Sequence, residues 1–109
     1  MDTLKQAILK ALQDYLDYLG NNDPETQLQI IADETNHHYF LFEIGWNGYR
    51  RIYGPIIHLN IIDNKIWIQH DGTEQGIATE LLAQGIEKQQ IVLAFKCLER
   101  RQITDFAVA

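Results

Sequence analysis

Apolar residues recur every three or four positions over the first twenty residues of the chain. They occupy positions 4, 7, 8, 11, 12, 15, 16 and 19. This spacing places them on one side of an α-helix, so the pattern predicts an amphipathic helix over 4–19 that packs on a sheet. Gly20 suits the left-handed residue that often follows a helix, and the segment Asn-Asn-Asp-Pro at 21–24 predicts that the helix ends there.

Four extended segments follow the helix, and turn residues separate them. We expect strands at 26–33, 38–46, 49–61 and 65–70. Positions 40, 42, 44 and 46 alternate onto one face of the second strand. The turns at 34–37, 47–48 and 63–64 are short, and Asn47-Gly48 is a strong hairpin signal, so consecutive strands should form an antiparallel meander. Gly54-Pro55 predicts a bulge or an edge in the third strand.

The last third of the chain mixes helical and extended signals. A second helix is expected to end at Gly85. Two residues are candidates for its N-cap: Asp71, which has Glu74 at capping-box spacing, and Thr73. Residues 91–95 fit a buried strand or the end of a third helix, and 103–108 predict a last strand. The expected fold is α+β in one domain, 1–109: an N-terminal helix, a four-stranded antiparallel meander, a second helix and short C-terminal strands.

The register of the first hairpin decides the partner of Arg51. A two-residue loop sets Ile44 opposite Arg51 and mixes charged with apolar partners. A three-residue loop sets Glu43 opposite Arg51, which is the better chemical match. We therefore expect Arg51 to form a cross-strand salt bridge, with contact to a phosphate or a partner as the less favoured alternative.

The second hairpin predicts a polar face that carries a tryptophan. A turn at 63–64 sets His58 opposite Gln69 and Asn60 opposite Trp67. An aromatic residue on an otherwise polar sheet face is typical of an interface, so these four residues are our interface candidates. The alternative is that a helix covers this face and makes Trp67 part of the core.

Composition and charge exclude several classes of protein. Apolar residues make up 46% of the chain and charged residues 22%, which is ordinary for a globular domain, and the longest apolar run is far too short to span a bilayer. A single cysteine, Cys97, forms no intramolecular disulfide and is expected to be a small buried residue. The first residues lack the pattern of a signal peptide, so we expect a cytoplasmic protein without a membrane partner.

The net charge of −6 argues against nucleic acid as the main partner. Residues 1–48 hold two basic and eight acidic side chains, whereas 49–109 hold seven of each. The basic residues that could contact DNA or another anion are Arg50, Arg51, Arg100 and Arg101. Direct DNA binding through them is the second hypothesis, and it requires all four to converge on one exposed face.

No catalytic residue, metal site or cofactor is predicted. The Asp63-Asn64-Lys65 sequence has the spacing of some metal-dependent nucleases, but a tight turn explains it better, so a small nuclease or hydrolase is the least favoured hypothesis. His37 and His38 are adjacent and would point to opposite faces of a strand, so they cannot bind one ion together.

One segment resembles a known family. The sequence GWNGYRRIYG at 45–54 is similar to the GW-x-G-x-RR-x-YG segment of the XisI family, the fdxN element excision controlling factors. The likeness continues through His58, KIWIQ at 65–69, IVL at 91–93 with Phe95, and FAVA at 106–109. The chain departs from the family at 58–61, where an aspartate usually follows soon after the histidine and this chain has HLNI. It also departs at Glu87, where a proline is usual, and at 96–99, where a His-Pro-Pro-like segment is common.

The resemblance implies an accessory role in developmentally controlled DNA excision in cyanobacteria. By this resemblance, the protein would be a partner of a companion controlling factor (XisH). It would act alongside a separate site-specific recombinase. The resemblance carries over no catalytic residue, which agrees with a non-enzymatic protein that works by protein contacts. We also expect a homo-oligomer, because exposed sheet edges are commonly paired or covered.

Overall fold

The structure is a computed structural model, and it describes residues 2–20 and 24–109. The predicted helix end at 21–24 therefore lies largely outside the described residues. The elements in chain order are α1 Asp2–Leu19, β1 Thr26–Asp33, β2 His38–Asn47, β3 Arg50–Ile62, β4 Lys65–Asp71, α2 Ile77–Ala83, the 3-10 helix η1 Lys88–Gln90, β5 Ile91–Val92 and α3 Leu98–Arg101.

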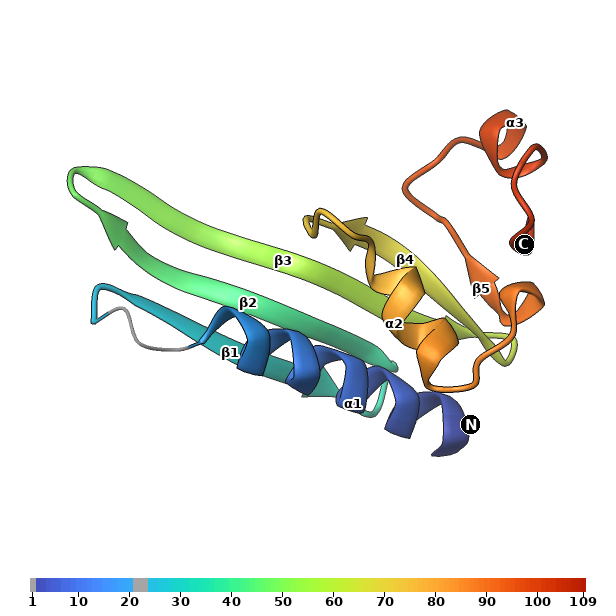
Figure 1. The fold of residues 1–109 in the computed structure, drawn as a ribbon, viewed down its shortest axis with the longest axis horizontal. Helices are drawn as coiled ribbons and strands as arrows, with labels where there is room; N and C mark the ends of the chain where they lie inside the picture. The colour runs from blue at the N-terminus through green and yellow to red at the C-terminus, as the bar shows by residue number, and fades with distance from the viewer. Residues whose placement is uncertain (1, 21–23) are drawn as a thin grey trace.

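The sheet has the strand order β1-β2-β3-β4-β5. The first four strands form the predicted antiparallel meander, and the fold is α+β as expected. A purely antiparallel four-stranded sheet was wrong, however, because β5 pairs with β4 in parallel and makes the sheet mixed. The reason is the crossover: α2 carries the chain back along the sheet, so the next strand enters beside β4 in the same direction (Figure 1).

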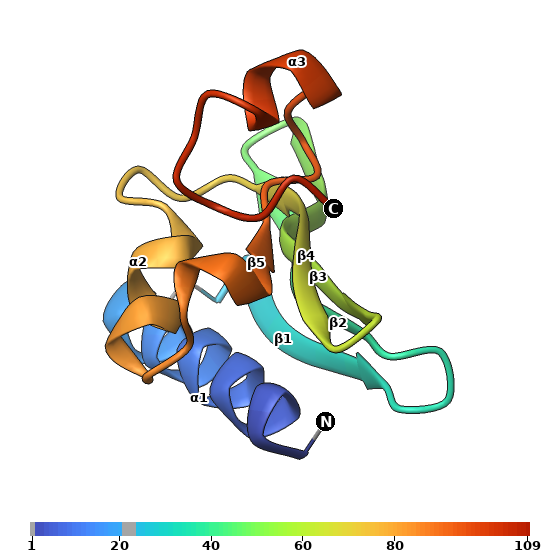
Figure 2. The ribbon, with the colours of Figure 1, turned by 90° about the vertical axis from the view of Figure 1, so that its right-hand side faces the viewer.

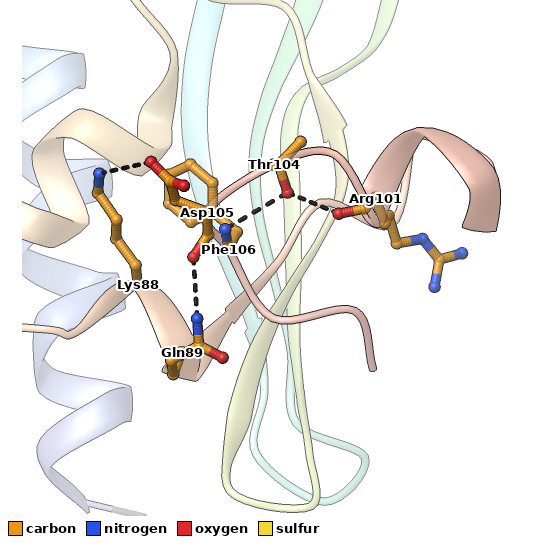
Figure 3. A network of polar contacts seen from close by, with 6 residues as sticks. All are labelled: Lys88, Gln89, Arg101, Thr104, Asp105 and Phe106. Carbon is orange, nitrogen blue, oxygen red and sulfur yellow. Dashed lines mark hydrogen bonds and ion pairs between the residues drawn. The ribbon is translucent and has the colours of Figure 1, made fainter.

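The predicted C-terminal strand over 103–108 was wrong. Ala107 alone bridges to the sheet, at Val92, and the residues before it form a turn. The Thr104 hydroxyl donates to the Arg101 carbonyl at 2.8 Å and accepts the Phe106 N–H at 3.3 Å (Figure 3). These local bonds compete with strand pairing, which is a known property of threonine side chains.

The helix α2 begins later than predicted, because Asp71 and Thr73 shape the loop before it. The Asp71 carboxylate accepts the Thr73 N–H at 3.0 Å, the Thr73 hydroxyl at 2.6 Å and the Ile77 N–H at 2.9 Å. The Thr73 hydroxyl in turn accepts the Gly76 N–H at 3.0 Å. Asp71 thus caps α2 from six residues away, and the capping-box arrangement with Glu74 is not formed.

Both α1 and α2 lie on one face of the sheet, whereas α3 lies on the opposite side (Figures 2 and 3). The buried stripe of α1 is the predicted one, with Ile8, Ala11 and Leu12 at 0% exposure. It packs on alternate residues of the three central strands, which are Tyr39, Leu41, Ile57, Leu59, Ile66 and Ile68. The side chains between them on β2 and β3 therefore point away from α1 and α2.

Both hairpin registers differ from prediction in part. At the first hairpin Asn47 pairs with Arg50 and Trp46 with Arg51, so the loop is Gly48-Tyr49 and the expected Glu43–Arg51 pairing was wrong. Gly48 adopts a φ of 64°, the left-handed conformation that a two-residue hairpin loop requires. The bulge predicted near Gly54-Pro55 in the third strand is confirmed: Leu41 pairs with Ile57 and Phe42 with Pro55, so Ile56 of β3 is the extra, unpaired residue.

At the second hairpin the expected pairing of Asn60 with Trp67 is confirmed. His58 pairs with His70 instead of Gln69, because the register shifts between His58 and Leu59. Asp63 and Asn64 have φ values of 51° and 61°, which fits the predicted tight turn. Among the residues that the structure describes, no helix is both long and apolar enough to cross a bilayer.

Candidate functional site

We call the side of β1, β2 and β3 that points away from α1 and α2 the open face. A continuous row of ring contacts runs along it, and we call this row the aromatic ladder. In order along the strands, the ladder consists of His38, His58, Phe40, Phe42, Tyr53, Arg51 and Trp46. Residues on alternate positions of neighbouring strands share one face, so the pleat of the sheet brings these side chains together.

The centre of the ladder is built by four rings. Phe40 stacks on His58 with the centroids 4.2 Å apart and the planes at 18°. Phe42 lies 6.4 Å from Phe40 and meets Tyr53 edge-on at 5.3 Å. These are favourable aromatic arrangements, and the rings support one another in their positions.

One end of the ladder is a histidine pair. Nδ1 of His38 lies 3.0 Å from Nε2 of His58, so one ring donates a hydrogen bond to the other. Burial lowers the pKa of His58, and the nearby His38 and His70 lower this pKa further. Because the ordinary histidine pKa is 6.5, His58 is mainly neutral at pH 7.

The other end of the ladder lies at the tip of the β2–β3 hairpin. The Arg51 guanidinium donates to the Gly45 carbonyl at 3.3 Å, and its Cζ lies 5.1 Å from the Trp46 ring centroid and 5.5 Å from that of Tyr53. Trp46 and Tyr53 remain 49% and 67% exposed. Large aromatic side chains so exposed, beside an arginine, have the composition of a protein interface.

The predicted interface residues lie at the β4 side of the same sheet face, and the C-terminal segment partly covers them. The Gln69 amide donates to Oδ1 of Asn60 at 3.1 Å, and Asn60 is only 6% exposed. Trp67 is half-buried, with Cζ of Arg101 5.7 Å from its ring centroid, and its indole N–H has no hydrogen-bond partner among the described residues. Of the four, only His58 belongs to the ladder.

The sequence placed residues 40, 42, 44 and 46 on one face but gave no sign of which face the helices cover. Phe40, Phe42, Trp46 and Tyr53 were therefore missed as candidate surface residues. One signal in the sequence could have identified these surface residues: aromatic residues flank the predicted Asn47-Gly48 turn. A turn is expected at the surface, and aromatic residues beside it have no core to enter.

The four candidate arginines do not converge. Arg50 and Arg51 lie at the tip of the β2–β3 hairpin, whereas Arg100 and Arg101 lie in α3, towards the other end of a molecule 41 Å long (Figure 1). Arg101 also donates to the Lys96 carbonyl at 2.9 Å and to the Val108 carbonyl at 3.0 Å. Arg101 thus holds the C-terminal segment in place, and the single basic surface that the DNA hypothesis requires is not formed.

A hollow of about 440 Å³ lies on the helix side, between the end of α1 and the loop before α2. Asp14, Glu74 and Glu80 line it together with Tyr15 and Tyr18. Lys10 pairs with Asp14 at 2.6 Å, and burial raises the pKa of Tyr15, so its phenol stays protonated at neutral pH. This arrangement gives a polar cleft with carboxylates but no activated nucleophile.

The remaining chemical candidates behave as turn and surface residues. Asp63 is exposed in the β3–β4 turn, where the nuclease-like spacing is explained by turn geometry. Cys97 is exposed, so the expectation of a buried cysteine was wrong. Within residues 2–20 and 24–109, no group of three or more metal-ligating side chains is brought together.

These features define a class of small α+β protein with two helices on one sheet face and an open, aromatic opposite face. The chain belongs to the XisI family: the family model described as "XisI protein" matches residues 1–108. The family that the sequence suggested is thereby confirmed.

Two solved structures are similar to the chain over almost its whole length. One is a XisI-like protein from Anabaena variabilis, with 35% identity and a TM-score of 0.85, covering 98% of this chain and 99% of that one. Another is the fdxN element excision controlling factor XisI from Anabaena variabilis, with 30% identity and a TM-score of 0.85, covering 99% of this chain and 97% of that one. No protein of curated function matches the chain.

Proposed function

We propose that the protein is an accessory factor in the control of site-specific DNA excision, and that it acts by binding proteins and not by catalysis. Family membership and the likeness to an fdxN excision controlling factor support the biological role. The observation that carries the mode of action is the aromatic ladder on the open face. Its partner in this proposal is a companion controlling factor, which acts beside a recombinase.

The ladder has the properties of a binding surface that is ready before its partner arrives. Exposed tryptophan, tyrosine and arginine are the residue types that contribute most to interface affinity, and Trp46, Tyr53 and Arg51 lie together. Because their rings and the guanidinium already contact one another, binding would freeze few rotamers. Each immobilised side chain otherwise costs about 0.5–1.5 kcal/mol.

Charge favours a protein over DNA as the direct partner. The chain carries −6 overall, and Arg51 is already engaged by Gly45 and two rings. A surface that neutralises few phosphates gives weak and strongly salt-dependent DNA binding. Contact with DNA is therefore assigned to the recombinase in this proposal.

Co-purification with the companion controlling factor tests the proposal, followed by titration of the purified pair. We expect binding at micromolar concentration or tighter. The double substitution Trp46→Ser with Tyr53→Ser should weaken this binding at least tenfold, because two exposed anchors are lost. The matched control is Tyr18→Ser, which removes a ring that is 80% exposed from the helix side.

The absence of a complex at about 10 μM would contradict the proposal, as would a double variant that binds like the wild type. A mobility shift of DNA by the protein alone, weakened by salt and abolished by Arg50→Ala with Arg51→Ala, would instead favour direct DNA binding.

A further inference from the structure

We propose that the open face binds a second copy of this chain, in an antiparallel two-fold dimer whose axis passes over Phe42. This inference rests on the proposed function only in taking the open face as an interaction surface. The second copy and the companion factor would then compete for the open face, so the monomer is the form that the companion factor binds.

The charges on the open face are opposite at its two ends. Asp33 pairs across the sheet with His38 at one end, and Arg51 pairs with Trp46 at the other. His38 and Trp46 are eight residues apart on β2, which corresponds to roughly 26 Å. Phe42 lies midway between them.

Asp33 keeps its charge at neutral pH. Hydrogen bonds from the Asn36 side chain, the Asn36 N–H and the Thr35 N–H lower the pKa of its carboxyl, and His38 lowers it slightly. The acidic end of the open face is therefore a fixed negative charge, as Arg51 is a fixed positive one.

A two-fold interface joins the same surface of both copies, so that surface must complement itself. Two sheet faces meet only when the axis lies in the plane between them. An axis across the strands reverses one copy and brings its Arg51 end over the Asp33 end of the other. An axis along the strands would set Arg51 near Arg51, and like charges in a desolvated interface are costly. The charge pattern therefore favours the antiparallel arrangement.

The rest of the surface is less suited to pairing two copies. The open-face positions of β1, β2 and β3 hold one acid, Asp33, and one base, Arg51, so this face is close to neutral. The helix side carries Asp14, Glu74 and Glu80 around its hollow. For a chain of charge −6, the open face is the surface on which two copies approach with least repulsion.

The size of the face is that of a small, reversible interface. A length of roughly 26 Å over three strands, spaced about 4.8 Å apart, gives roughly 400 Å² of flat face per copy before the relief of the side chains is counted. Standard stable interfaces bury about 800 Å² per partner. We therefore expect a reversible dimer with a dissociation constant in the micromolar range.

Sedimentation and thiol crosslinking test the dimer directly. Sedimentation velocity of the wild-type protein from about 1 to 200 μM should show conversion from monomer to dimer. For crosslinking, the exposed native cysteine is removed by Cys97→Ser, and a single cysteine is then introduced. A bis-maleimide crosslinker roughly 8 Å long, which reacts with one thiol at each end, matches side chains that meet between sheets packed about 10 Å apart.

Three positions distinguish the arrangements. Phe42→Cys should crosslink into a dimer, because the axis passes over it. Tyr49→Cys, at the hairpin tip, should not, because an antiparallel pair separates the two tips by roughly 45 Å. Tyr18→Cys on the helix side is the exposed control and should also stay monomeric. A variant of Phe42 that fails to fold is replaced by Ile44→Cys, one position along the same face.

Each outcome decides the inference. A protein that stays monomeric at 200 μM overturns the dimer. If substitutions in the ladder still weaken binding of the companion factor in that case, the proposed function stands, and the companion factor is the occupant of the open face. Crosslinking through Tyr49 but not Phe42 overturns the antiparallel arrangement. A dimer that crosslinks through Phe42 but binds no companion factor supports the inference and contradicts the proposed function.

Discussion

Replacement of Gly45 by alanine probes how tightly β1 is held against β2. An ideal Cβ at this position would contact the Glu25 carbonyl oxygen and lie 2.6 Å from Cα of Thr26. Both are backbone atoms, so no rotamer change makes room. The start of β1 is therefore pushed away from β2, and the hydrogen bond from the Trp46 N–H to the Glu25 carbonyl, now 3.0 Å, is lost as well.

The expected cost follows from these two contributions. Overpacking against a rigid neighbour costs about 1–3 kcal/mol, and loss of one backbone hydrogen bond costs about 0.5–1.5 kcal/mol. We therefore expect Gly45→Ala to lower the free energy of unfolding by about 2–4 kcal/mol. For a domain of this size the melting temperature should fall by roughly 10–20 °C.

Urea unfolding followed by far-ultraviolet circular dichroism measures this change. The matched control is Gly48→Ala, where a Cβ meets no atom within 4 Å and only the positive φ is unfavourable. That control should cost about 1 kcal/mol. If Gly45→Ala costs no more than Gly48→Ala, the close approach of β1 to β2 does not limit stability and the reasoning is refuted.

Three further changes test other parts of the fold. Asp71→Ala should destabilise the protein by about 2–3 kcal/mol in urea, because it removes the carboxylate that organises the loop before α2, whereas Asp71→Asn should cost less. Tyr39→Phe should leave stability unchanged or raise it by about 1 kcal/mol, since the buried hydroxyl has no hydrogen-bond partner among the described residues. A loss of stability above about 1 kcal/mol would show that the hydroxyl does have a partner. Tyr53→Phe, at an exposed ring, is the control. The folded state lowers the pKa of His58 below its ordinary value of 6.5, so the unfolded chain binds the proton more readily and stability should fall as the pH drops below about 6.5. His58→Gln should flatten that dependence in urea titrations at pH 7.5 and 5.5, and an unchanged slope would contradict this origin.

The His58 dependence also bears on the open face. Protonation of His58 would place a positive charge beside His38, at the end of the face that holds Asp33. In the proposed dimer this end meets Arg51 of the other copy. Dimerisation should therefore weaken as the pH falls, which sedimentation at pH 7.5 and 5.5 would measure.

Local patterns in the sequence were sufficient for α1 and for the four-stranded meander. The apolar stripe of α1 and the turn residues around Gly48 and at 63–64 act within a few residues of themselves, although the first loop formed one residue later than predicted. Periodicity and positive-φ turns need no distant partner, so they can be recognised without the tertiary structure. Pairing of Asn60 with Trp67 followed from turn length alone.

Competition between bonds decided the elements that were mispredicted. The start of α2 depends on a carboxylate six residues upstream, and the C-terminal turn depends on one threonine hydroxyl. The Glu43–Arg51 pairing looked favourable as chemistry, but the loop geometry around Gly48 and Tyr49 set the register. A salt bridge at a surface contributes about 1 kcal/mol or less, which is too little to shift a long strand pair.

The sequence by itself determined which residues alternate along β2 and β3, and with them the two sides of the sheet. Only the tertiary structure decided which side α1 and α2 cover, because the packing of helices against a sheet depends on contacts between residues distant in the chain. That choice buried Tyr39 and Leu41 and left the rings of Phe40, Phe42 and Tyr53 on the open face. Both sides of β2 are apolar enough to be a core, so hydrophobicity alone could not tell core from surface.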